Sequence, residues 1–205
     1  MTKNEYGGLL VAIDGPNGVG KTTLIKGLIS KLQQDNLNIW DTREPTNSQI
    51  GNFTRTMSET LDSKSLACLV GADRYYHLEQ EIIPYLQKNA IVLTDRYILS
   101  SLILQRMDNV DTRLILNINS DIVLPDIQFV VTASENIICN RLNDRPTLTR
   151  FERGARTHEE LRFLNEGVNI LSGLDVNVIT IENDNDLYGN INLMYSYIQK
   201  EWNAK

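Results

Sequence analysis

The sequence has few cysteines, and this shortage limits its chemistry. Among 205 residues only Cys68 and Cys139 occur, and their surroundings lack the spacing of a metal site. Both lie within apolar helical patterns, where a free thiol behaves as a small buried hydrophobe. We therefore expect two buried structural thiols and a reducing compartment.

Basic residues and long apolar runs are also scarce. The chain has 20 Lys and Arg against 26 Asp and Glu, a net charge of −6. This argues against DNA or RNA as a partner, because polyanion binding needs many cationic contacts. No apolar run approaches the roughly 18 residues of a membrane span, and no signal-peptide core precedes Leu9. We expect a cytoplasmic protein without membrane or nucleic-acid partners, whereas a small anionic ligand is compatible with the composition.

The chain also lacks any segment with the composition of an interdomain linker. No stretch is rich in proline, glycine and serine, and no block of like charges divides the chain. With 41% hydrophobic residues, a chain of this length can bury one sizeable core. The sequence therefore predicts one domain spanning residues 1–205.

Short apolar runs alternate with longer segments of helical spacing. We predict strands at residues 9–13, 38–40, 91–93, 127–131 and 176–181, and helices at residues 22–34, 50–57, 65–87, 99–105, 134–143, 158–171 and 187–202. Such alternation is typical of an α/β fold with a five-stranded, mostly parallel sheet covered by helices on both faces. Ligands of such sheets bind beyond the carboxyl ends of the strands. Pro84 should kink or end the third helix unless the backbone before it relaxes.

The first predicted strand runs into a phosphate-binding motif. Residues 15–22 read Gly-Pro-Asn-Gly-Val-Gly-Lys-Thr, which fits the pattern G-x-x-x-x-G-K-[ST]. A strand, a glycine loop and a helix in succession direct backbone N–H groups inward, where the helix dipole adds positive charge. We expect a nucleoside triphosphate to bind here, with Lys21 on the β- and γ-phosphates and the Thr22 hydroxyl on Mg²⁺. A glycine-rich turn with an accidental lysine is the alternative.

Charged residues also end the next two predicted strands. Asp95 follows the third strand beside the phosphate loop, where its carboxylate can hold a water on Mg²⁺. Capping of the next helix is the alternative. Arg43, Arg74 and Arg96 lie far apart in the sequence, but the predicted sheet brings them to one crevice. Arginine forks match phosphate oxygens, so this crevice suits transfer of a phosphoryl group to an anionic acceptor. Surface salt bridging is the simpler role for any one of them.

A second basic cluster surrounds Pro146 in a stretch poor in large apolar residues. Its members are Arg141, Arg145, Arg150, Arg153 and Arg156. We predict an arginine-rich lid at residues 144–156 that closes on the γ-phosphate and keeps out water. The alternative is a solvated loop paired to Glu152, Glu159 and Glu160. His77 and His158 have neither triad nor metal spacing, so we assign them no chemistry.

Several ordered motifs resemble the thymidylate kinase family. Besides the phosphate loop, they are Thr42-Arg43-Glu44-Pro45, Ala72-Asp73-Arg74 followed by His77 and Pro84, Asp95-Arg96-Tyr97 followed by Ser100, Ser101 and Gln105, Pro125-Asp126, and Arg150-Phe151-Glu152. They span residues 9–152, and their order and spacing carry the resemblance. It implies a P-loop nucleoside-monophosphate kinase fold, a homodimer, and phosphoryl transfer from Mg·ATP to dTMP, which gives dTDP.

The resemblance also implies roles for individual residues. Arg74 and Arg96 would hold the acceptor phosphate, Arg43, Glu44 and Pro45 would line the acceptor site, and Ser101 and Gln105 would lie near the base. The phosphate loop has no internal arginine, which is similar to the bacterial form of the family, in which the lid supplies the catalytic cation. The candidates are Arg145, Arg150 and Arg153, acting with Lys21, Asp95 and Arg96. ATP would contact Gly15, Asn17, Gly18, Val19, Gly20, Lys21, Thr22, Thr23 and Arg141, and the acceptor would also contact Asn17, Val70 and Leu104.

Four positions depart from the family pattern. Val70 stands where the family usually has a phenylalanine against the thymine ring, and Leu104 stands where it usually has an aromatic residue under the sugar and base. Loss of an aromatic stacking contact costs about 1–3 kcal/mol. Asn17 replaces a frequent Asp or Glu near the acceptor sugar, and Thr149 replaces the acid before the lid Arg-Phe-Glu. Phosphoryl transfer is therefore better supported than strict thymidylate specificity.

Three hypotheses follow. The first is an ATP-dependent kinase of a pyrimidine deoxynucleoside monophosphate, with dTMP as the best single acceptor. The second is a kinase for a nucleoside 5′-hydroxyl or a modified nucleotide, against which Arg74 and Arg96 argue because a nucleoside has no phosphate. The third is a nucleotide-sensing protein that binds ATP without transfer, against which Lys21, Thr22 and Asp95 argue.

Overall fold

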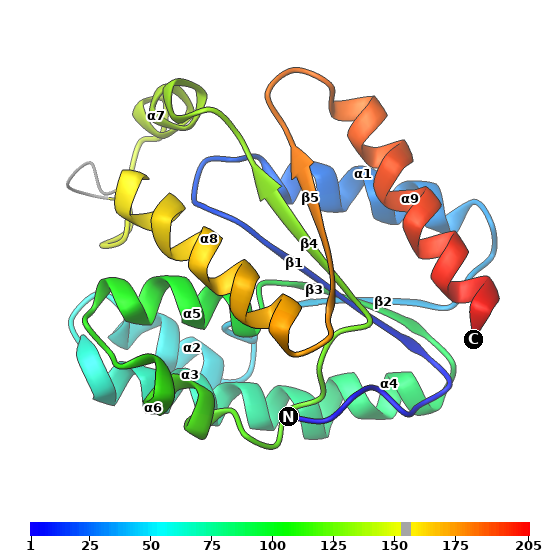
Figure 1. The fold of residues 1–205 in the computed structure, drawn as a ribbon, viewed down its shortest axis with the longest axis horizontal. Helices are drawn as coiled ribbons and strands as arrows, with labels where there is room; N and C mark the ends of the chain where they lie inside the picture. The colour runs from blue at the N-terminus through cyan, green and yellow to red at the C-terminus, as the bar shows by residue number, and fades with distance from the viewer. Residues whose placement is uncertain (153–156) are drawn as a thin grey trace.

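A parallel sheet forms the centre of the molecule (Figure 1). The computed structural model describes residues 1–152 and 157–205. In these parts of the chain, five strands lie in the order β2-β3-β1-β4-β5, and every neighbouring pair is parallel. They are β1 (Leu9–Asp14), β2 (Ile39–Arg43), β3 (Ile91–Asp95), β4 (Ile127–Thr132) and β5 (Asn177–Glu182). The predicted α/β class and the five strands are confirmed, and the sheet is entirely rather than mostly parallel.

Helices connect the strands and cover both faces of the sheet. They are α1 (Lys21–Gln33), α2 (Gln49–Met57), α3 (Ser63–His77), α4 (Ile83–Gln87), α5 (Ile98–Met107), α6 (Thr112–Ile118), α7 (Glu135–Asn143), α8 (Thr157–Gly173) and α9 (Leu187–Ala204). The helix α6 was not predicted, because a run of seven residues rich in Leu and Ile is too short for periodicity to identify. None of the helices in residues 1–152 and 157–205 has both the length and the apolar character needed to cross a membrane.

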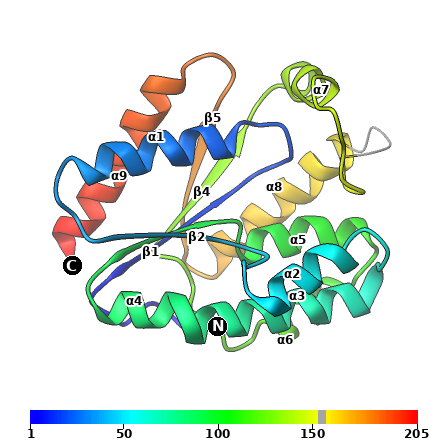
Figure 2. The ribbon, with the colours of Figure 1, turned by 180° about the vertical axis from the view of Figure 1, so that it is seen from behind.

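The alternation of side chains along β1 divides the core in two. Leu10 and Ala12 belong to one cluster, which includes buried residues of α3, α5 and α8. Leu9, Val11 and Ile13 belong to the other, which includes buried residues of α1 and α9. Figure 2 shows α1 and α9 together on one side of the sheet and α3, α4 and α5 on the other. Because both faces are covered, the functional groups gather at the carboxyl ends of the strands.

The backbone before Pro84 relaxes instead of breaking the helix. The segment predicted as one helix is α3, a π-helical turn at Leu78–Ile82 and then α4, with Pro84 in the first turn of α4. A proline in a regular helix removes a donor and clashes with the carbonyl one turn earlier. The wider π turn places this disruption where the hydrogen-bond pattern already changes.

The expectation of buried cysteines is wrong. Cys68 on α3 and Cys139 on α7 are free thiols, and both are exposed. Cys68 follows the buried residues Leu66 and Ala67, so it lies one position past the face of α3 that packs on the core. Apolar neighbours in the sequence therefore did not identify the buried face.

Candidate active site

The phosphate loop connects β1 to α1, as its sequence context predicted. Gly15, Gly18 and Gly20 have φ values of 153°, 82° and 93°, in the region that favours glycine. A Cβ atom at Gly15 would lie 2.1 Å from the carbonyl oxygen of Val131, and one at Gly20 would lie 2.6 Å from Asn183 Nδ2. Conformation therefore favours glycine at all three positions, and at Gly15 the neighbouring backbone also leaves no space for a Cβ atom.

Lys21, the first residue of α1, is folded back against the loop. Its side chain is buried, and Nζ donates to the carbonyl oxygens of Gly15 at 2.7 Å and Pro16 at 2.8 Å. Burial lowers the pKa of Lys21 to about 7, and the Arg96 charge acts in the same direction, while Asp95 and Glu160 oppose it. An anion in the loop would stabilise the charged ammonium.

The residues beside the loop fit a magnesium ion. Asp95 ends β3, its Cα is in register with that of Ile13 on β1, and its Oδ1 atom is buried without a hydrogen-bond partner among the described residues. The Thr22 side chain is exposed in the first turn of α1. A carboxylate and a hydroxyl oxygen, completed by phosphate oxygens and water, are the ligands that Mg²⁺ prefers. Within the described chain, no group of three or more His, Cys, Asp or Glu could hold a metal by itself, so a protein-only site is excluded there.

Asp14 is a buried carboxylate that the sequence reasoning missed. It accepts hydrogen bonds from Ser100 Oγ at 2.5 Å, Gln128 Nε2 at 3.1 Å and the backbone N–H of Tyr97 at 3.3 Å. Burial raises the pKa of Asp14, although the hydrogen bond from Ser100 and the Arg96 charge act against it. Asp14 therefore ties the end of β1 to α5. Its place at a strand end, directly before the phosphate loop, was the signal that could have identified it.

A pocket of about 360 Å³ opens beside the phosphate loop. All the predicted acceptor residues line it: Asn17, Arg43, Glu44, Pro45, Val70, Arg74, Arg96, Ser101, Leu104 and Gln105. The predicted convergence of Arg43, Arg74 and Arg96 is therefore found. Sequence reasoning missed other members of the lining, among them Thr54 and Arg55 of α2 and Phe151. Thr54 and Arg55 carry no motif of their own, and Phe151 belongs to the lid motif but was given no role in the acceptor site.

Arg96 lies at the end of the pocket nearest the phosphate loop. Its Nη2 donates to Asn17 Oδ1 at 2.7 Å, and its Nη1 donates to Ser100 Oγ at 3.1 Å. The backbone of Arg96 has a φ of 74°, which is uncommon for a residue with a side chain. Its N–H donates to the Ile13 carbonyl, and its carbonyl accepts from Thr94 Oγ1. The sheet end thus holds a strained conformation that directs this guanidinium toward the loop.

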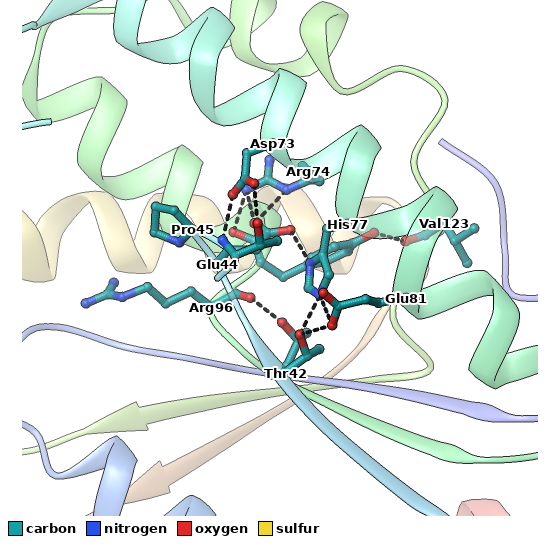
Figure 3. Close-up of polar contacts among 12 residues, drawn as sticks. Thr42, Glu44, Pro45, Asp73, Arg74, His77, Glu81, Arg96 and Val123 are labelled. Carbon is teal, nitrogen blue, oxygen red and sulfur yellow. Dashed lines mark hydrogen bonds and ion pairs between the residues drawn. The ribbon is translucent and has the colours of Figure 1, made fainter. Parts of the chain in front are cut away.

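Arg74 lies deeper and has a different set of partners (Figure 3). It is 1% exposed, and Nε and Nη2 donate to Glu44 Oε2 at 2.9 and 2.7 Å. Nη2 also donates to Ser101 Oγ, and Nη1 donates to Asn119 Oδ1. Burial acts to raise the pKa of Glu44, but the charges and hydrogen bonds of Arg74 and His77 together lower it.

The two arginines occupy different parts of the pocket. Figure 3 shows the side chain of Arg96 extending away from the Arg74–Glu44 pair. Arg74 contacts Ser101 on α5, whereas Arg96 contacts Asn17 in the phosphate loop. The prediction that both hold one phosphate stays a prediction, and the geometry favours Arg96 for that role.

The loop that follows β5 lies on the other side of the phosphate loop. A hollow of about 340 Å³ is lined by Gly18, Gly20, Thr23, Arg141, Arg145, Asn183, Asp184, Asn185 and Leu187. Arg141 Nη1 and Asn183 Nδ2 both donate to the Val19 carbonyl, at 3.1 and 2.7 Å. Arg141 Nη2 also donates to the carbonyls of Asn183 and Asp184. This hollow and the acceptor pocket therefore lie against the same glycine loop.

The lid arginines separate into two groups. Arg145 lines the second hollow, where its Nη1 pairs with Glu152. Arg150 lies elsewhere: Nη1 and Nη2 donate to the two carboxylate oxygens of Asp108 at 2.8 and 2.7 Å, and Nε donates to the Ser58 carbonyl. This conformation does not bring Arg150 to the phosphate loop. The candidates Arg153 and Arg156 lie outside the described residues.

The chain is similar to proteins of one family. A model of the family described as "Thymidylate kinase" matches residues 13–187. A probable thymidylate kinase of Caldivirga maquilingensis is 35% identical over 149 residues, which cover 71% of this chain and 73% of the relative. A probable thymidylate kinase of Pyrobaculum calidifontis is 32% identical over 147 residues, which cover 70% and 74%.

The fold agrees with these sequence relationships. The crystal structure of thymidylate kinase from Ehrlichia chaffeensis matches with a TM-score of 0.72 at 24% identity, over 94% of this chain and 99% of that one. At that identity the likeness shows the fold alone. The family match spans the phosphate loop, the acceptor pocket and the loop after β5, and the chain therefore belongs to the thymidylate kinase family.

Proposed function

We propose that the protein transfers the γ-phosphoryl group of Mg·ATP to dTMP, which yields ADP and dTDP. The observation that carries this proposal is the position of Arg96, which joins the phosphate loop through Asn17 and also lines the 360 Å³ pocket. A guanidinium at that junction can bind an acceptor phosphate within reach of a triphosphate. An oxygen of the acceptor phosphate then attacks the γ-phosphorus while the bond to the bridging oxygen of ADP breaks.

The donor side binds and orients the triphosphate. Backbone N–H groups of residues 17–22 would surround its phosphates, and Lys21 would leave the carbonyls of Gly15 and Pro16 to neutralise them. Thr22 and Asp95 would hold Mg²⁺, which supplies charge stabilisation for the transferring group when bound. The hollow lined by Arg141 and Asn183 would receive the adenosine end of ATP.

The acceptor pocket would bind the phosphate of dTMP at one end and its base at the other. Arg96 would hold the phosphate, as argued from its contact with Asn17. Arg74, Ser101 and Gln105 would face the base, because Arg74 is bound to Glu44 and Ser101 and lies in the part of the pocket that contains Gln105. Donors and acceptors on a fixed α3–α5 wall suit the carbonyl and N–H edge of a pyrimidine. This proposal differs from the prediction that Arg74 also holds the phosphate.

Arg145 is our candidate for the lid cation. Of the two lid arginines that the structure describes, Arg145 lines the hollow beside Gly18 and Gly20, and it forms an ion pair with Glu152. On binding of ATP, Arg145 would exchange this carboxylate for the developing charge on the γ-phosphoryl group. The part of the lid at residues 153–156 lies outside the described residues.

A second acceptor is favoured by one observation. The pocket wall has Val70 and Leu104 where an aromatic residue would stack on the base, so selection of thymine rests on polar contacts and on Phe151. Another pyrimidine deoxynucleoside monophosphate is therefore the alternative. A coupled ADP-release assay over a panel of nucleoside monophosphates tests both. Turnover highest with dTMP supports the proposal, whereas the absence of turnover with every monophosphate contradicts it.

We further propose that a homodimer of single-domain chains, acting in the cytoplasm, is the working form. The resemblance to the family supports the dimer, and the absence of linker composition supports one domain. Light scattering should give twice the 23.3 kDa of one chain, and a single cooperative unfolding transition should accompany it.

A further inference from the structure

We propose that Glu160, on the first turn of α8, is a positioning residue that sets the Asn17 amide and through it the Arg96 guanidinium. This inference rests on the proposed function, because it assigns Arg96 to the acceptor phosphate. Glu160 belongs to none of the motifs by which the sequence resembles its family. It lies 143 residues from Asn17 in the sequence, yet the two are in contact.

The contact uses both nitrogen atoms of Asn17. Glu160 Oε1 accepts from the backbone N–H of Asn17 at 3.2 Å and from Asn17 Nδ2 at 3.4 Å. On the other side, Asn17 Oδ1 accepts from Arg96 Nη2 at 2.7 Å. The Glu160 side chain is only 4% exposed, so water competes little for these contacts.

The chemistry of the three groups allows one orientation of the amide. A carboxylate accepts hydrogen bonds, a guanidinium only donates, and an amide has one end of each kind. Asn17 satisfies both neighbours only when its nitrogen faces Glu160 and its oxygen faces Arg96. Removal of Glu160 would free the amide to turn, and among the described residues the Arg96 guanidinium would keep only its hydrogen bond to Ser100 Oγ.

The charges around Glu160 agree with this role. Burial raises its pKa, while the Asn17 N–H, Arg96 and Lys21 stabilise the carboxylate and Glu152 opposes them. Glu160 thus brings one negative charge between the two cations that would meet the phosphates. Glu160 lies in the first turn after the lid. Its side chain therefore connects the position of α8 to the orientation of the Arg96 guanidinium.

An exchange of the two side chains tests the proposal. In N17D, two carboxylates face each other, which should repel and turn residue 17 away from Glu160. In N17D/E160Q, the amide introduced at position 160 can donate to the carboxylate introduced at position 17 and accept from the backbone N–H there, while that carboxylate accepts from Arg96. All three contacts re-form with the roles of acid and amide exchanged. Glu166→Gln on the same helix is the matched control, because the Glu166 side chain is 43% exposed and pairs with Arg106, away from Asn17 and Arg96.

We expect N17D to raise the KM for dTMP at least about tenfold, as coupled residues of one network do, with the KM for ATP changed much less. The N17D/E160Q variant should recover most of that loss, and Glu166→Gln should match the wild type. Thermal unfolding distinguishes a positioning role from a merely structural one. If the role is merely structural, the variants should lower the Tm without a selective increase in the KM for dTMP. A double variant no better than N17D, or an N17D variant with an unchanged acceptor KM, overturns the proposal.

Calorimetric titration with dTMP makes this test independent of turnover. If the wild type binds dTMP but phosphorylates no monophosphate, the proposed function fails, while the Kd values of the wild type and the three variants still decide the role of Glu160. If the wild type does not bind dTMP at all, both are overturned.

Discussion

Arg74 and Glu44 form a buried ion pair in which Nε and Nη2 lie 2.9 and 2.7 Å from the same carboxylate oxygen, Oε2. The pair joins α3 to the residue after β2, and the two side chains are 1% and 5% exposed. His77 Nδ1 lies 3.3 Å from the other oxygen of Glu44. The acceptor pocket therefore has a wall whose charged groups are held before any substrate arrives.

Removal of Glu44 should destabilise the protein strongly. In Glu44→Ala, Arg74 stays buried without its carboxylate, which costs about 3–5 kcal/mol. Urea unfolding measures the loss. The control is Glu166→Ala, which removes a more exposed carboxylate from Arg106 and should cost at most about 1 kcal/mol. Equal losses of unfolding free energy in the two variants would show that burial does not increase the contribution of the Arg74–Glu44 pair to stability.

Binding of ATP should take up a proton at pH 8. The pKa of Lys21 is lowered to about 7 in the free protein, first by burial and then by Arg96, so the amine is mostly neutral at that pH. Phosphates in the loop favour the charged form and raise the pKa again. The complex then holds more protons than the free protein, so affinity falls as the pH rises above 7.

Calorimetry in two buffers of different ionisation enthalpy measures this uptake. Lys21→Arg is the control, because arginine keeps its charge at every pH of the experiment. Proton uptake should disappear in that variant. Uptake that persists undiminished would mean that another group carries the linkage.

Arg145 and Arg150 should differ in their effect on turnover. Arg145 lines the hollow beside the phosphate loop, so Arg145→Ala should lower kcat by about 10²–10³, as loss of one charge-stabilising group does. Arg150 is bound to Asp108, so Arg150→Ala should lower kcat less and should be reproduced by Asp108→Asn. The double variant Arg150→Ala with Asp108→Asn should add little, because the two residues share one interaction. An Arg150→Ala variant as slow as Arg145→Ala would show that Arg150 leaves Asp108 during the reaction.

A phenylalanine at position 70 should tighten the binding of dTMP. Val70 lines the pocket without a π face, and stacking of a base on an aromatic ring is worth about 1–3 kcal/mol. Calorimetric titration of Val70→Phe with dTMP measures the gain. Val70→Leu is the control, since it adds volume without an aromatic ring. Weaker binding by the phenylalanine variant would place the base away from α3.

The phosphate-loop part of the donor side was predictable because its parts are contiguous. The strand, the glycine loop and the first turn of α1 occupy residues 9–22, and each has a local signature. The gathering of Arg43 and Arg96 was also predictable, since they lie at the carboxyl ends of β2 and β3 and these ends share one edge of the sheet. Arg74 joins them from α3. The partners of Arg74 were not predictable, because Ser101 reaches it from α5 and Asn119 from the residue after α6.

Packing between distant segments also decided the exposure of the cysteines and the places of the lid arginines. The apolar neighbours of Cys68 predicted burial, but the packing of α3 left that thiol outside. The lid sequence offered three candidate cations, and only the fold decided that Arg150 meets Asp108 while Arg145 lies by the loop.

The amino-acid order by itself determined the α/β class, the family and the position of the glycine loop between β1 and α1, since these depend on periodicity and on short motifs. Tertiary structure alone decided which arginine faces the phosphate loop and that Glu160 reaches Asn17. Hydrogen bonds act over about 3 Å and depend on direction, so they are set only when distant segments have packed.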